Sequence, residues 1–275
     1  MTDTAFPESL ALVGAGKMGG AMLEGWLAAG LPAKAVSVHD PAPAETIAGL
    51  AAARGLALNP DARARGPVAV LVLAIKPQML EAAAPGLAPL VDAGTLVVSV
   101  LAGKTIANLA AALPGAGAIV RAMPNLPAAI GRGATGAHAS PAVSPAQRAI
   151  ADTLLRASGL VEWVDDESLI DAVTGVSGSG PAYVFALVEA LAEAGVAAGL
   201  APDLAMRLAR QTVVGAGALL DESDLPAETL RRNVTSPGGT TAAGLAVLQR
   251  GEGGLADLMR ETVAAAKRRA GELSG

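Results

Sequence analysis

The stretch Leu10-Ala-Leu-Val-Gly-Ala-Gly-Lys-Met-Gly19 indicates the fold of the first half of the chain. Its four apolar residues Leu10–Val13 predict a buried strand, and a helical pattern begins at Lys17. The glycines between them have the spacing G-x-G-x-x-G, which at a strand-to-helix turn is typical of a dinucleotide pyrophosphate site. The alternative is a tight turn without a ligand. The residues expected to bind the cofactor here are Gly14, Ala15, Gly16, Lys17, Met18 and Gly19.

Strands and helices alternate along the rest of this half. Further strands are predicted at Ala35–His39, Val68–Ile75, Thr95–Val100 and Ala118–Arg121, and helices at Lys17–Ala29, Ala44–Arg54, Gln78–Leu90 and Ile106–Leu113. Continuous runs of Val, Leu and Ile indicate strands that are buried on both faces. The pattern predicts an α/β fold, a Rossmann-type, doubly wound and mostly parallel sheet wrapped by helices.

The second half lacks such strands. Helices are predicted at Glu167–Val173, Pro181–Gly199, Pro202–Leu220, Pro226–Asn233, Thr241–Arg250 and Leu255–Glu272. We therefore expect a dinucleotide-binding domain at 1–164 and an all-helical domain at 165–275. The stretch Pro181–Leu200 approaches membrane-spanning length, but it contains Glu189 and Glu193, and we expect a buried helix there.

Composition excludes several classes of protein. Hydrophobic residues make up 52% of the 275 and charged residues 16%, which excludes a disordered chain. A net charge of −5 and an aromatic content of 2% argue against nucleic-acid binding. The chain has no cysteine and two isolated histidines, His39 and His138, so no metal site is expected. The first residues, Met1–Glu8, lack the features of a signal peptide, and we expect a cytoplasmic protein with no membrane partner.

The ends of the other strands supply further candidates, because ligands of such sheets bind beside the carboxyl ends of the strands. Asp40 ends the second strand, where an acidic residue takes the ribose hydroxyls of NAD or simply forms a turn with Pro41. Lys76 either lies near a ribose or phosphate or is solvated. Asn125 is an amide at the expected nicotinamide end. The other candidates at strand ends are Ala74, Ile75, Pro77, Ala102 and Gly103.

Two segments of small residues precede helices in the second half, Val176–Pro181 and Thr235–Thr241. Each either holds an anion on backbone N–H groups or only caps its helix. This half has no histidine, and its first lysine is Lys267, so a tuned general base is hard to supply. Hydride transfer to an electrophilic centre needs no such base.

Taken together, these segments resemble the pyrroline-5-carboxylate reductases over nearly the whole chain. The most specific stretches are Ala172–Tyr183, which reads AVTGVSGSGPAY, and Val234–Thr241, which reads VTSPGGTT. The resemblance implies an oxidoreductase that reduces 1-pyrroline-5-carboxylate to L-proline with NADPH or NADH. It also implies a homodimer formed by the helical domain, in some members assembled into a decamer of five dimers.

The resemblance assigns residue roles as well. Thr240 or Thr241 would hydrogen-bond the imine nitrogen, and Asn59 would lie near the adenosine phosphate. The substrate would be bound by Ser177, Gly178, Ser179, Gly180, Thr235, Ser236, Gly238 and Gly239. Many members lack an acidic residue where Asp40 stands and prefer NADPH, so the cofactor preference stays open.

Two alternatives remain. One is a related reductase of the same architecture that acts on another imine or a β-hydroxy acid; the β-hydroxy acid chemistry would normally need a lysine on a helix of the second domain. The other is a non-catalytic dinucleotide sensor, for which the second-half segments would have no use.

Overall fold

The computed structural model describes residues 6–273 as two compact units. The first unit comprises the chain up to Gly178 together with its end from Ala266, and the second comprises Ser179–Ala265. Residues 1–5, within the segment examined for a signal peptide, and residues 274–275 lie outside the described part.

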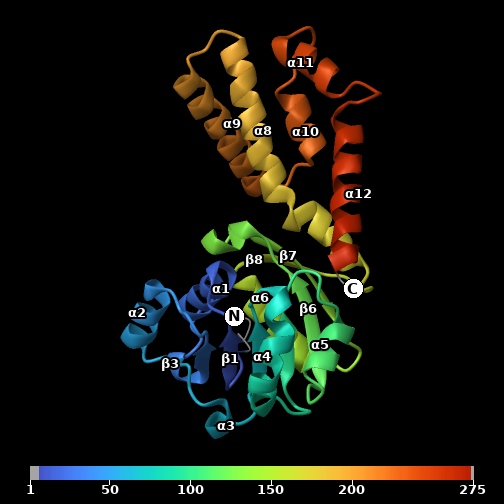
Figure 1. Cartoon of the computed structure of the whole chain (residues 1–275). Helices are drawn as coiled ribbons and strands as arrows, with labels where there is room; N and C mark the ends of the chain where they lie inside the picture. Colours follow the sequence, from blue (N-terminus) through green and yellow to red (C-terminus); the bar gives the residue numbers. More distant parts are fainter. Residues whose placement is uncertain (1–5, 274–275) are drawn as a thin grey trace. The chain divides into compact units, whose positions relative to one another are not determined.

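The first unit is built on one eight-stranded sheet (Figure 1). Its strands are β1 (Leu10–Val13), β2 (Val36–His39), β3 (Ala57–Leu58), β4 (Val70–Leu73), β5 (Leu96–Ser99), β6 (Ala118–Met123), β7 (Gly133–Ala139) and β8 (Gly159–Trp163). They lie in the order β3-β2-β1-β4-β5-β6-β7-β8, and all neighbours are parallel except β6 and β7. The predicted mostly parallel, doubly wound sheet is confirmed.

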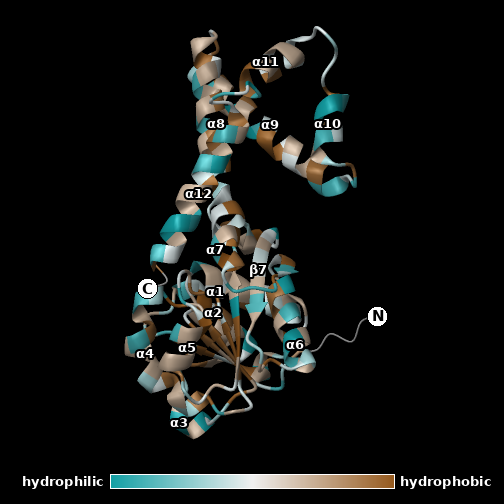
Figure 2. Cartoon of the chain, turned by 90° about the vertical axis from the view of Figure 1, so that its right-hand side faces the viewer, coloured by the Kyte–Doolittle hydropathy of each residue, from teal (hydrophilic) through white to brown (hydrophobic). Residues whose placement is uncertain are grey.

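Helices cover both faces of this sheet. On one face α1 (Lys17–Ala28), α2 (Glu45–Arg54) and α6 (Pro145–Arg156) pack on Leu10 and Leu12 of β1. On the other, α4 (Leu80–Leu87) and α5 (Ile106–Ala112) pack on Ala11 and Val13. The short helix α3 (Ala62–Arg65) follows β3. Alternate residues of β1 thus point to opposite cores, which explains why the strand is apolar throughout; Figure 2 colours the central strands brown for this reason.

Sequence patterns did not reveal β7, α6 and β8, and the interpretation that the sheet ends at Arg121 was wrong. Strand β7 reads GATGAHA and lacks the branched apolar residues that mark the other strands. One reason is packing: a Cβ on Gly136 would lie 2.6 Å from Cγ1 of Val173, which follows in α7 (Leu169–Val173). Close approach of a helix here requires glycine.

The division at 178/179 falls later than the domain boundary expected at 164/165. Helix α7 and the turn η5 (Thr174–Gly178) group with the sheet unit. They do so because Arg121 of β6 forms ion pairs with Glu167 and Asp171.

The second unit contains α8 (Gly180–Ala197), α9 (Pro202–Glu222), α10 (Ala227–Asn233), α11 (Thr240–Leu248) and most of α12 (Leu255–Leu273). Helices α8 and α9 are joined by a short turn at Gly199 and pack along each other, with Gly195 close to Ala205. Each predicted helix of this half is present. The expectation that α8 is buried was wrong for a single chain, because Ala192 is its one buried residue.

Candidate functional site

The glycine-rich loop joins β1 to α1 and is shaped by two of its glycines. Gly14 has φ +86°, a left-handed conformation, and a Cβ there would lie 2.8 Å from the carbonyl oxygen of Ala74. A Cβ on Gly19 would overlap the carbonyl oxygen of Gly14. These two glycines are therefore required by the fold, since one allows the turn and the other lets α1 pack against it.

Gly16 meets no such constraint. Its φ of −68° is open to any residue, and a Cβ there would meet nothing within 4 Å. It is the N-cap of α1, and no side chain caps that helix. The N–H groups of the first helical turn thus lack a side-chain cap, and such groups are suited to bind an anion such as a pyrophosphate.

Asp40 lies beside this loop at the end of β2. Its Oδ2 accepts a hydrogen bond from the backbone N–H of Ala15 at 2.8 Å, and its Oδ1 accepts one from Ala42 at 2.9 Å. Asp40 thus forms a turn, and its carboxylate also contacts the glycine-rich loop, while its binding of a ribose stays a prediction.

Asn59 holds the backbone of Asp40 in place. Its Oδ1 accepts from the N–H of Asp40 and its Nδ2 donates to the carbonyl oxygen of Asp40, both at 2.8 Å. Asn59 is the one described non-glycine residue with positive φ, at 50°, a conformation that asparagine tolerates. Its amide therefore supports Asp40.

The other strand ends lie along the same edge of the sheet. Ala74 and Ile75 contact the Gly14 position, whereas the side chain of Lys76 is exposed and Pro77 begins the turn η2 (Pro77–Met79). Ala102 is exposed, and Gly103 has φ +73°. A cavity of about 260 Å³ adjoins the start of α1, lined by Lys17, Met18, Leu126 and Ala129. Its far wall is the turn η4 (Leu126–Ile130), which follows β6.

Asn125 does not present a free amide at this edge. Its Nδ2 donates to the carbonyl oxygen of Ser177 at 3.0 Å, and its Oδ1 accepts from the N–H of Ala134 at 2.9 Å. The side chain thus ties the end of β6 to η5. We assign it a positioning role for Ser177.

The segment expected to be a loop at Ser177–Gly180 is instead continuous helix. The turn η5 is π-helical and leads directly into α8, whose N-cap Ser179 has helical φ and ψ. Hydroxyls of Thr174 and Ser177 donate to carbonyl oxygens one turn earlier, at 2.9 and 3.1 Å. Such π turns are frequent at functional sites. The small residues therefore form a π-helical turn rather than a loop before a free helix end. At Gly178 a small residue is needed for packing, because a Cβ there would lie 2.8 Å from Met123 Cε.

The segment Thr235–Thr241 is a true loop before a helix. Gly238 has φ +72°, Gly239 is the N-cap of α11, and no side chain caps that helix. Thr240 and Thr241 are exposed in its first turn. Both threonines are thus accessible, and the first N–H groups of α11 have no side-chain cap.

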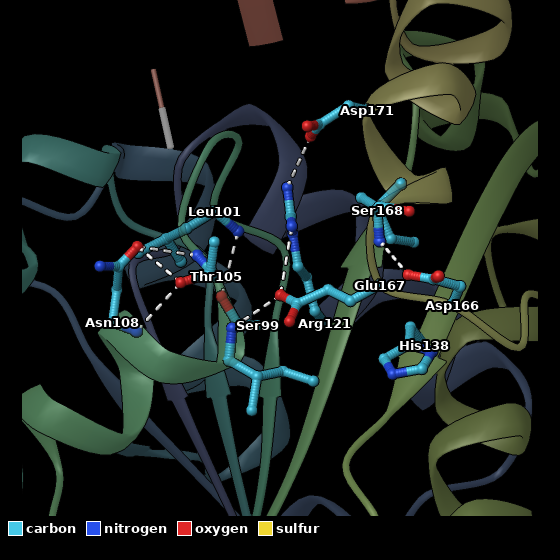
Figure 3. A network of polar contacts seen from close by, with 12 residues as sticks. Ser99, Leu101, Thr105, Asn108, Arg121, His138, Asp166, Glu167, Ser168 and Asp171 are labelled. Atoms are coloured by element: carbon cyan, nitrogen blue, oxygen red, sulfur yellow. Dashed lines mark hydrogen bonds and ion pairs between the residues drawn. The ribbon is translucent and has the colours of Figure 1, made fainter. Parts of the chain in front are cut away.

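A buried ion-pair cluster was missed by sequence reasoning (Figure 3). Arg121, whose side chain is 4% exposed, contacts Glu167 at 3.2 Å and Asp171 at 3.1 Å. Glu167 also accepts a hydrogen bond from the N–H of Ile106 at 2.8 Å. The cluster joins β6, the start of α5 and α7, and so fixes the element that leads into η5. A charged residue within the apolar strand AIVRAM was the available signal.

Neither histidine supplies an evident acid or base. Burial, with a smaller effect of Arg65, lowers the pKa of His39 and so favours its neutral ring. His138 contacts the carbonyl oxygen of Val164 through Nδ1 at 2.9 Å. Residues 6–273 contain no group of three or more His, Asp or Glu suited to a metal.

The fold, together with a glycine-rich loop that leaves room beside Gly16, is that of a Rossmann-type, dinucleotide-dependent oxidoreductase. Models of two families match the chain: "NADP oxidoreductase coenzyme F420-dependent" at residues 9–103 and "Pyrroline-5-carboxylate reductase dimerisation" at 167–273. The pyrroline-5-carboxylate reductase of Pseudomonas aeruginosa is 41% identical over 266 residues, covering 96% of each chain. That of Synechocystis is 41% identical over 217 residues, covering 78% of this chain and 79% of its own.

Solved structures agree. A pyrroline-5-carboxylate reductase from Coxiella burnetii superposes with a TM-score of 0.89 at 34% identity, covering 98% of this chain and 99% of its own. The Plasmodium falciparum pyrroline carboxylate reductase, solved with NADP bound, gives 0.79 at 26% identity, covering 97% and 98%. The chain belongs to the pyrroline-5-carboxylate reductase family, and the suspected resemblance is confirmed. It is an NAD(P)H-dependent oxidoreductase.

Proposed function

We propose that this chain reduces 1-pyrroline-5-carboxylate to L-proline with NADPH or NADH, the last step of proline synthesis. The observation that carries the proposal is the space beside Gly16, where the fold leaves room for a Cβ that nothing fills. A glycine that the fold does not need, next to uncapped N–H groups, is explained by a phosphate that approaches the backbone. The second-half segments specific to the family support the choice of substrate.

For the cofactor, we propose that residues 14–19 hold the pyrophosphate and that Asp40 lies at the adenosine ribose, positioned by Asn59. Ala74–Pro77 with Ala102 and Gly103 would line the ribose and nicotinamide side. The cavity beside Lys17 and Met18 continues from the phosphate loop toward η4 and β6, which supports this direction of binding. When bound, the dihydronicotinamide supplies a hydride, two electrons with one hydrogen nucleus.

For the substrate, we propose that the first turn of α11 and the η5 segment bind the cyclic imine. Backbone N–H groups after Gly238 and Gly239 would hold the carboxylate, and the hydroxyl of Thr240 or Thr241 would hydrogen-bond the ring nitrogen. The C=N carbon receives the hydride while the nitrogen takes one proton, giving a secondary amine. The protein chiefly positions the two reactants, an effect worth up to roughly 7–11 kcal/mol when alignment is good.

For the assembly, the match to the dimerisation family supports an oligomer, and exposed apolar residues of α8 and α9 support the same conclusion. We propose a homodimer as the basic unit, assembled further into a decamer of five dimers, in the cytoplasm. The functional domains would be 1–164 for the dinucleotide and 165–275 for the substrate and the dimer.

The test measures the rate at which NADH and NADPH are oxidised in the presence of saturating 1-pyrroline-5-carboxylate. The comparison is the reverse assay, in which β-hydroxy acids are offered with NAD⁺ or NADP⁺ and reduction of the dinucleotide is measured. We expect oxidation that depends on the imine and yields proline, and no reduction of NAD⁺ or NADP⁺ by the hydroxy acids. Activity with a β-hydroxy acid alone would favour the competing reductase. Binding of a dinucleotide without turnover of either substrate would favour a sensor. Replacing Thr240 and Thr241 with Val separately should identify the hydroxyl that acts, because one variant loses kcat and the other retains it.

A further inference from the structure

We propose that this chain binds NADH in preference to NADPH, and that Asp40 determines this choice. The inference rests on the proposed function, since it concerns the adenosine end of the same dinucleotide site. The two can be tested separately, because this inference is measured by the ratio of the dissociation constants of NADPH and NADH, whereas the proposed function is measured by turnover.

The position of the Asp40 carboxylate is fixed from two sides. Asn59 pairs with both the N–H and the carbonyl oxygen of Asp40, and the N–H of Ala15 binds Oδ2. Asn59 thus fixes the backbone of Asp40, and turning the carboxylate away from the glycine-rich loop would break its hydrogen bonds with Ala15 and Ala42. A carboxylate has about four acceptor sites, and Ala15 and Ala42 occupy one on each oxygen. Acceptor capacity remains for the 2′-hydroxyl of the adenosine ribose, which NADH offers and which carries a phosphate in NADPH.

The surrounding charges give a 2′-phosphate little support. Residues 41–53 after β2 contain no Lys or Arg. Arg65 donates to the carbonyl oxygen of Ala35, which precedes β2 and so lies at the opposite end of that strand from Asp40. Lys76 follows β4, which β1 separates from β2, so the two strands are about 10 Å apart.

Lys17 is the remaining basic residue of the loop, and it lines the cavity with Leu126 and Ala129 on the β6 side. A phosphate monoester carries roughly −1.5 to −2 charges near pH 7. A 2′-phosphate beside Asp40 would be repelled by the fixed carboxylate, and none of the basic residues considered above is positioned to compensate for this repulsion. The ribose hydroxyls of NADH would instead donate to that carboxylate.

The experiment measures dissociation constants of NADH and NADPH for the full chain by nicotinamide fluorescence, without substrate. We expect wild type to bind NADH at least about tenfold more tightly, equivalent to ~1.4 kcal/mol. Asp40→Asn, which removes the charge at nearly constant shape, should reduce the ratio of the two constants by about tenfold. The ratio should also fall as salt rises, because salt screens the repulsion. Asp40→Ser provides a second variant if Asp40→Asn folds poorly.

Glu45→Gln is the matched control, because it removes one nearby negative charge at an exposed position. Its ratio should stay within about twofold of wild type. Wild-type binding of NADPH as tight as that of NADH would overturn the inference and leave the proposed function intact. An unchanged ratio in Asp40→Asn, or an equal change in Glu45→Gln, would overturn the role of Asp40. Binding of neither dinucleotide would overturn the proposed function itself.

Discussion

The three glycines of the loop after β1 differ in what restricts them. Gly14 and Gly19 are needed because Ala74 and the Gly14 carbonyl leave no room for a Cβ. Gly16 has room and ordinary backbone angles. The spacing in the sequence predicted all three positions, but it could not separate the two glycines required by packing from Gly16, where the fold leaves room for a side chain. That distinction depends on neighbours from β4, far away in the sequence.

We therefore predict that Gly16→Val folds normally and loses the dinucleotide. The branched side chain would fill the space that a pyrophosphate needs, and the dissociation constant of NADH should rise at least about 100-fold, or ~2.7 kcal/mol. Calorimetric titration and thermal unfolding measure the two effects. Gly19→Ala is the contrasting variant, since its methyl overlaps a backbone oxygen and should lower the unfolding temperature. A folded Gly16→Val protein with wild-type affinity would contradict the assignment of the loop.

At the level of helices and strands, sequence patterns predicted the strands that are buried on both faces. They missed the elements whose structure depends on contacts with residues far away in the sequence. Apolar strands β1, β4 and β5 were predicted because both of their faces are covered. Strand β7 was missed because its glycines accommodate Val173. The segment Ser177–Gly180 was predicted to be a loop because small residues usually mark one. Its helical state is supported by Asn125 and by the Arg121 cluster, contacts that no local pattern reveals.

We predict that Arg121→Leu destabilises the sheet unit by about 3 kcal/mol. This value is the low end of the ~3–5 kcal/mol expected when a buried pair loses one partner, because Glu167 and Asp171 are 29% and 19% exposed. Chemical denaturation measures the change. Arg260→Leu is the control: its side chain is 74% exposed in a surface pair with Asp257, and its loss should cost under ~1 kcal/mol. Equal effects of the two variants would argue that the cluster is not structural.

For the whole molecule, the apolar surface of the helical unit is the dominant feature. Phe185, Leu187 and Val214 are exposed by 55%, 53% and 62%. The stretch Leu169–Ala197 is also long and apolar enough to cross a membrane by composition, with 6% of its best window buried. This region matches the dimerisation family, which supports an oligomer, and we propose that another copy of the chain covers its apolar face. The resemblance seen in the sequence already implied a homodimer of the helical domain, whereas the exposure of these apolar side chains became visible only in the structure.

We predict that the protein is at least a dimer at micromolar concentration, with a mass of twice 26.9 kDa or a multiple of it. Light scattering after size exclusion measures this mass. Replacing Phe185 and Val214 with Asp should shift the mass toward the monomer and abolish activity, because charged side chains cannot be buried unpaired. The matched exposed variant Leu126→Asp, in the sheet unit, should leave the mass unchanged. A fully active monomer would contradict this account of the helical unit.

The central claim is that this chain transfers a hydride from the dinucleotide to the C=N carbon of 1-pyrroline-5-carboxylate. The direct measurement uses NADH deuterated at the transferred position of C4 and locates the deuterium in the product by NMR. We expect L-proline with one deuterium on the ring carbon that adjoins nitrogen and does not bear the carboxylate. Proline without deuterium at that carbon, or dinucleotide oxidation without proline, would contradict the claim.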